Sequence, residues 1–156
     1  MARIKNERYG FISCEGESLL VQRMGVVPKN IWWINGYGEL LCQLANGDTV
    51  CVFSVKSFAV SAFDLFGKLA YFEQCGINFV CENERFLNFS NNKPLQKRAV
   101  QVLRSIAYRE QEFALWIQNS RLSADIKTVL INRIRHEFMT EVVLIFQNES
   151  VCKRGN

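Results

Sequence analysis

The chain has 156 residues, of which 49% are hydrophobic and 22% charged, a composition typical of one globular domain. It contains no run of about 18 apolar residues, which excludes a membrane-spanning helix, and its polar, basic start predicts no secretory signal. We therefore expect a cytoplasmic protein with free thiols. The net charge of +4 comes entirely from residues 95–156, with ten basic and six acidic groups, as in some nucleic-acid-facing surfaces.

Short apolar runs alternate with helical patterns over the first 81 residues. Strands are predicted over 9–13, 30–34, 49–53 and 77–81, and helices over 18–23, 39–44 and 58–74. The run 49–53 is apolar on both faces, which favours a parallel sheet covered by helices on both sides. The sequence therefore predicts an α/β domain with a central, mainly parallel sheet of four or more strands.

Residues 95–118 contain neither glycine nor proline and predict one long helix, followed by a helix over 124–138 and an apolar run over 142–146 of undetermined type. At about 1.5 Å per residue the long helix spans about 36 Å, more than a small domain needs to cover its sheet. We therefore expect part of its apolar stripe to contact a second subunit. The residues expected at this dimer interface are Leu103, Ile106, Phe113 and Ile117. We expect residues 1–120 to form one domain, and residues 121–156 to be a short extension that is not a separate domain.

The six cysteines and the single histidine, His136, show no metal-binding pattern. No Cys-x-x-Cys pair occurs, and the cysteine spacings match no zinc framework. The chain also lacks a glycine-rich phosphate loop. We therefore predict no metal site and no cofactor.

Several short motifs share their order and spacing with one known family. Residues 9–13 read Tyr-Gly-Phe-Ile-Ser, residues 18–22 read Ser-Leu-Leu-Val-Gln, and a Gly-Asp pair at 47–48 opens the third predicted strand. On the long helix, Leu103, Ala107 and Glu110 form a Leu-x-x-x-Ala-x-x-Glu pattern. Over residues 6–120 the chain resembles the catalytic domain of the resolvase/invertase family of serine recombinases.

This resemblance implies a resolvase-like three-layer domain and an activity of site-specific DNA strand cleavage and rejoining. In that family a serine hydroxyl attacks a backbone phosphate without a metal, and arginines supply the positive charge. Ser13 stands at the nucleophile position, and Gln22 and Glu110 stand at the family's glutamine and glutamate positions.

The arginines of the family are missing from this chain. Phe11 replaces the arginine two residues before the nucleophile, and Gln111 replaces the one that follows the glutamate. Residues 56–60 read Lys-Ser-Phe-Ala-Val where the family has Asp-Arg-x-x-Arg. Each lost cation of this type costs roughly 10²–10³ in rate. We therefore expect a non-catalytic member that dimerises and acts in, or regulates, DNA transactions of a mobile element.

DNA, a second copy and a recombinase are the candidate partners. The cations expected to face DNA are Lys56, Arg104, Arg109, Lys127, Arg133 and Arg135. Residues 121–156 are short for a module that reads DNA sequence, so such reading is not expected, and weak contact with the DNA backbone stays open. Two alternatives stay open: an active recombinase that uses Ser13 with rewired cations, and an unrelated α/β protein-interaction module.

Overall fold

The computed structural model describes residues 6–89 and 92–147. Four strands form an all-parallel sheet in the order β2-β1-β3-β4, which confirms the predicted α/β class and the parallel sheet. In register, Tyr9 lies opposite Val50, which lies opposite Phe79. The strands are β1 (Arg8–Ile12), β2 (Ile31–Trp33), β3 (Thr49–Val52) and β4 (Asn78–Cys81).

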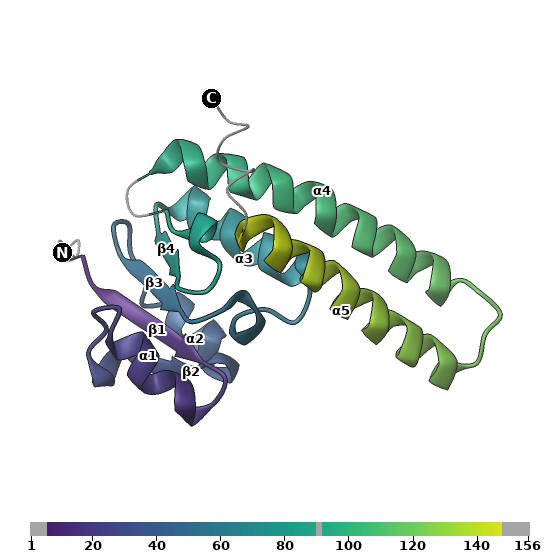
Figure 1. Ribbon diagram of the computed structural model, residues 1–156, viewed down its shortest axis with the longest axis horizontal. Coiled ribbons are helices and arrows are strands. Elements are labelled where there is room, and N and C mark those ends of the chain that lie inside the picture. Colours follow the sequence, from purple (N-terminus) through teal and green to yellow (C-terminus); the bar gives the residue numbers. More distant parts are fainter. Residues whose placement is uncertain (1–5, 90–91, 148–156) are drawn as a thin grey trace.

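The helices cover the two faces of this sheet unequally. On one face Val21 of α1 and Val26 pack on Ile12 and Cys51 in a small cluster. The other face carries the main core, against which α2, α3, α4 and α5 pack (Figure 1). The helices are α1 (Ser18–Gln22), α2 (Tyr37–Leu41), α3 (Ala62–Cys75), α4 (Lys93–Gln118) and α5 (Ala124–Gln147).

Aromatic rings form the centre of the main core. Phe11 of β1 and Phe79 of β4 point to the same face because side chains alternate along a strand. Both rings contact Phe58, with centroids 5.7 and 5.3 Å apart, and Phe72 of α3 adds a ring 6.0 Å from Phe58. All four side chains are fully buried. Tilted pairs at these separations are favoured by the ring quadrupoles in addition to the burial of apolar area.

Helix α3 begins later than the sequence pattern indicated. The predicted helix over 58–74 starts instead at Ala62, because the Ser61 hydroxyl accepts a hydrogen bond from the Asp64 amide and caps the first turn. A separate 3-10 helix, η4 (Val55–Ser57), precedes it. Gly76, with φ of 71°, ends α3 in the left-handed conformation.

Helices α4 and α5 form a long antiparallel hairpin whose tip extends beyond the sheet (Figure 1). Helix α5 is continuous over Ala124–Gln147, so the run 142–146 of undetermined type belongs to the same helix as 124–138. Met139, Val142 and Phe146 of α5 are buried in the main core. Residues 148–156 lie outside the described part.

The dimer interface that we expected on α4 is wrong for most of its residues, because α5 runs back along α4. Leu103 and Ile106 lie in the core of the chain itself, and Ile117 is also buried. Of the four residues expected to contact a second subunit, Phe113 alone is half-exposed, and its ring contacts Phe138 of α5 at 6.0 Å. The apolar stripe of α4 is therefore covered mainly by α3 and α5, because both pack along it.

Replacing Leu103 tests this placement. Leu103→Ala removes a fully buried side chain and should lower the free energy of unfolding by about 2–5 kcal/mol, whereas half-exposed Phe113→Ala should cost less. Urea unfolding followed by circular dichroism measures both. A Leu103→Ala cost below about 1 kcal/mol, together with weakened self-association, would place Leu103 at a subunit interface instead.

Candidate functional site

The strand order creates a topological switch point between β1 and β3. The chain leaves β1 toward β2 on one side and returns to β3 on the other side of β1. In open parallel sheets, ligands bind outside the carboxyl ends of the strands at such a point. Ser13 follows β1 there, and Ser54 and Ser57 follow β3. The structure thus brings the expected nucleophile position to the part of the sheet where chemistry is commonly found.

The carboxylate of Glu17 lies between the ends of these two strands. Glu17 closes the 3-10 helix η1 (Glu15–Glu17) and is only 8% exposed. Its Oε1 accepts hydrogen bonds from the backbone N–H of Ser13 at 2.7 Å and from the Ser13 hydroxyl at 3.1 Å. The Ser57 hydroxyl donates to its Oε2. The hydrogen-bond donors of Ser13 and Ser57 at the switch point are therefore bound to a carboxylate of the protein itself, that of Glu17.

A second carboxylate, that of Glu84, holds the loop that follows β3. Glu84 follows β4, is fully buried, and accepts hydrogen bonds from the Ser54 hydroxyl at 2.9 Å and the Val55 amide at 3.3 Å. Burial raises the pKa of the nearby Cys81 thiol, and the charge of Glu84 raises it further. Within residues 6–89 and 92–147, no lysine or arginine side chain pairs with Glu17 or Glu84.

Glu110, the expected catalytic glutamate, is used to join α4 to α3. Its side chain is buried, with 2% exposure, and it accepts hydrogen bonds from the amides of Ala62 at 3.0 Å and Phe63 at 3.3 Å. These amides belong to the first turn of α3, which a negative charge stabilises. Burial raises the pKa of Glu110, while the two amides and the charge of Arg135 act in the opposite direction.

The three expected catalytic positions are not joined to one another. Gln22 donates to the hydroxyl of Ser18, one turn earlier on α1, at 3.3 Å. Ser13 is exposed and bonded to Glu17, and in the described part of the chain no hydrogen bond links it to Gln22 or Glu110. Glu17, which sequence reasoning missed, is the group that Ser13 contacts.

Several of the cations expected to face DNA have partners within the protein. Arg109 pairs with Glu141 at 2.7 Å, and Arg133 pairs with Glu137 at 3.4 Å. The Lys127 ammonium donates a hydrogen bond to the backbone carbonyl of Gln118, at the end of α4, at 2.8 Å. Their positive charges are compensated or used in capping, which makes them weaker candidates for phosphate contact.

Lys56 and Arg135 lie together in a different setting. Both line a surface hollow of about 390 Å³, with His136 and Asn132 beside them and apolar walls that include Met139. Neither cation forms an ion pair in the part of the chain that the structure describes. Arg104 lies elsewhere, with its guanidinium 5.3 Å from the ring centroid of Tyr108.

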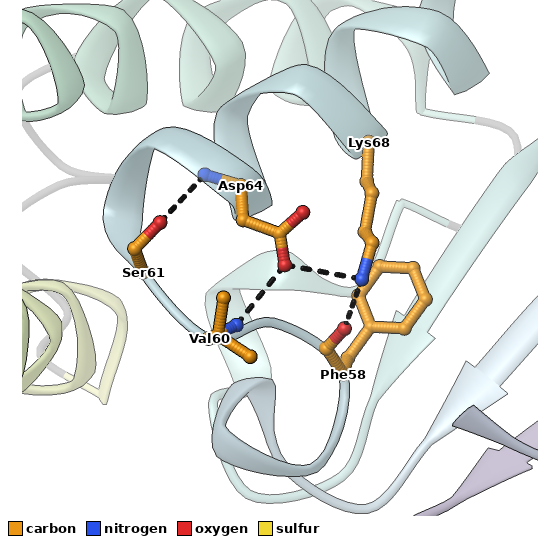
Figure 2. A network of polar contacts seen from close by, with 5 residues as sticks. All are labelled: Phe58, Val60, Ser61, Asp64 and Lys68. Carbon is orange, nitrogen blue, oxygen red and sulfur yellow. Dashed lines mark hydrogen bonds and ion pairs between the residues drawn. The ribbon is translucent and has the colours of Figure 1, made fainter. Parts of the chain in front are cut away.

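Figure 2 shows another polar network, which joins Asp64 and Lys68 of α3 to the segment before this helix. It lies beside a cavity of about 570 Å³ between α2, α3, α4 and α5. The Lys68 ammonium lies 3.2 Å from the Asp64 carboxylate and donates to the carbonyl of Phe58 at 2.5 Å. Asp64 also accepts from the Val60 amide at 3.0 Å, and Ser61 caps the same turn. The network therefore fixes the segment 58–61 to α3, which gives it a structural role.

Comparison of the chain with models of known protein families gives no match, and comparison with curated proteins gives none either. Within the residues that the structure describes, no helix is long and apolar enough to cross a membrane. The resemblance to serine recombinases therefore rests on the quoted motifs alone.

The raised pKa of Glu110 predicts a pH-dependent stability. The folded state holds this proton more tightly than the unfolded state, so the contribution of Glu110 is fully present below its ordinary pKa of 4.5 and is lost as pH rises through the higher folded-state pKa. The free energy of unfolding of the wild type should therefore fall, relative to Glu110→Gln, between acidic and neutral pH.

Urea titrations at several pH values measure this difference. The matched control is Glu112→Gln, which removes one charge from an exposed position on the same helix. A difference between wild type and Glu110→Gln that is constant with pH would contradict the prediction.

Proposed function

We propose that this chain is a non-catalytic serine-recombinase-like protein, which acts in or regulates DNA transactions of a mobile element by association and not by strand cleavage. The observation that carries the proposal is the Glu17 carboxylate at the switch point, bonded to Ser13 and Ser57. A phosphodiester there would meet like charge: two unit charges about 4 Å apart repel by about 4 kcal/mol at an effective dielectric of 20.

The positions of the missing arginines support the proposal. Phe11, at one such position, is fully buried, and its ring lies 5.2 Å from that of Tyr37. In the resemblance the segment 56–60 corresponds to Asp-Arg-x-x-Arg, so Ser57 stands at an arginine position and donates to Glu17 instead. Restoring an arginine at Phe11 would bury a guanidinium in an aromatic core, which is costly without a partner.

An assay for covalent adducts tests the absence of cleavage. Purified protein is incubated with labelled duplex, nicked and supercoiled DNA, then analysed under denaturing conditions. We expect no protein–DNA adduct, and no difference between wild type and Ser13→Ala, because the reaction lacks the charge that the transition state needs. An adduct that Ser13→Ala abolishes would contradict the proposal and favour the alternative of an active recombinase.

A second candidate function, contact with the DNA backbone, is favoured by the hollow that Lys56 and Arg135 line. Two cations without an ion-pair partner in the described residues, with His136 beside them, suit phosphate oxygens. Lys56 directly precedes Ser57, so the hollow lies beside the loop that follows β3. Contact of this kind is independent of base sequence and falls with salt, because it releases counterions.

Charge removal at the hollow tests this contact. The double variant Lys56→Ala/Arg135→Ala should weaken binding to generic duplex DNA and reduce the slope of log K against log salt by about two. Fluorescence anisotropy across a salt series measures both quantities.

The matched control removes two positive charges elsewhere. Lys29→Ala/Arg109→Ala changes an exposed turn before β2 and a cation already paired with Glu141. Equal slopes for the two double variants would show that net charge, and not the hollow, determines binding. Absence of binding at low salt would remove this second candidate.

A further inference from the structure

The outward face of α5 carries four exposed residues in a symmetrical pattern. Ile126, Arg133, Glu137 and Leu144 follow one another at intervals of seven, four and seven residues. At about 3.6 residues per turn, these intervals place all four on a single stripe of the helix. Ile126 and Leu144 are 48% and 62% exposed, and the side chains of Arg133 and Glu137 are 76% and 65% exposed.

We propose that this stripe is a homodimer interface, in which α5 packs antiparallel against α5 of a second copy. The pattern is centred on residue 135, so reversal of the helix direction matches each position with its counterpart. Ile126 then meets Leu144 of the partner subunit at both ends of the contact. Arg133 meets Glu137 of the partner subunit twice near the centre, because the two-fold axis makes every contact reciprocal.

The charges of the stripe favour a second copy over other occupants. Arg133 and Glu137 cancel one another, so the stripe offers no excess positive charge to a nucleic acid. Within one chain they form an exposed pair at positions i and i+4, a type of contact that adds little to stability. Exchange of the two pairs within the chains, one in each copy, for two pairs between subunits therefore loses little, and it fixes the register of the contact.

The dimensions of the stripe also suit a helix pair. Ile126 and Leu144 are separated by 18 residues, or about 27 Å along the helix. Val129, which is strongly exposed, adds apolar surface beside the stripe. The inward face of α5 is occupied by its own fold, with Met139, Val142 and Phe146 in the core. The outward stripe is thus the face of α5 that is left for a partner.

This inference deepens the proposed function, since it rests on the claim that the protein acts by association, and it names the partner. It also replaces the interface expected on α4, whose Leu103 and Ile106 are buried within the chain. Two copies joined through α5 would project their α/β domains from a shared helical centre.

Sedimentation velocity of the full chain at micromolar concentrations tests the interface. The wild type should sediment as a dimer. Leu144→Lys should raise the dimer dissociation constant about tenfold or more, because it places a charge in an apolar contact. The matched control is Leu115→Lys, which adds the same charge at an exposed leucine of α4 that lines the 570 Å³ cavity, and it should leave the dimer intact.

A charge exchange gives a second and more specific readout. Arg133→Glu and Glu137→Arg should each weaken the dimer, because like charges then face one another across the interface. The double variant Arg133→Glu/Glu137→Arg should restore it. Since all these positions are exposed, circular dichroism should show folded protein in every case.

Three outcomes would overturn the interface on α5. They are a monomeric wild type at high micromolar concentration, a dimer that Leu144→Lys leaves intact, and a double variant that does not recover. The adduct assay on the same preparations separates this failure from that of the proposed function. A monomer without adducts overturns the interface alone, whereas a dimer that forms adducts through Ser13 overturns the non-catalytic role alone.

Discussion

The Glu17 carboxylate accepts hydrogen bonds from two loops and so holds them together. These loops form the edge of the sheet at the carboxyl ends of its strands. One loop follows β1 and supplies the amide and hydroxyl of Ser13, and the other follows β3 and supplies the hydroxyl of Ser57, 40 residues further along the chain from Glu17. A buried carboxylate is tolerated only with such donors, and the donors would be left unsatisfied without it. The positions of the two loops and the burial of the Glu17 carboxylate therefore depend on each other.

The same principle recurs at two other places in the fold. Glu84 accepts hydrogen bonds from the loop after β3, and Glu110 accepts them from the first turn of α3. Each carboxylate joins segments that are distant in sequence around the aromatic core. The polar framework behind the sheet edge is consequently acidic. A reaction on a phosphodiester needs positive charge in that place, which is why we infer association and not catalysis.

The sequence was sufficient for the features that depend on local pattern. The four strands are short apolar runs bounded by turns, and each observed strand begins and ends within one residue of its predicted bounds. The start of α3 was predicted too early because Phe58 fits the helical period, although it packs in the core ahead of the cap at Ser61. A pattern of apolar positions does not show where a cap interrupts it.

Features that depend on tertiary contact could not be predicted in this way. The stripe on α4 led us to expect Leu103 and Ile106 at a contact with a second subunit, whereas the chain itself covers them. Glu17 carries no sequence signal beyond its place in a turn, and its role appears only when β1 and β3 lie side by side. Likewise, the sequence shows that Arg109 and Arg133 are basic, but only the structure shows that Glu141 and Glu137 compensate their charges.

Titration of the folded protein with inorganic phosphate, followed by the amide resonance of Ser13 in nitrogen-15 NMR spectra, tests the central claim most directly. If Glu17 occupies the donors at the switch point, this resonance should not shift with millimolar phosphate at neutral pH. A saturable shift of the Ser13 amide would mean that the switch point itself accepts a phosphate group, and it would contradict the non-catalytic account.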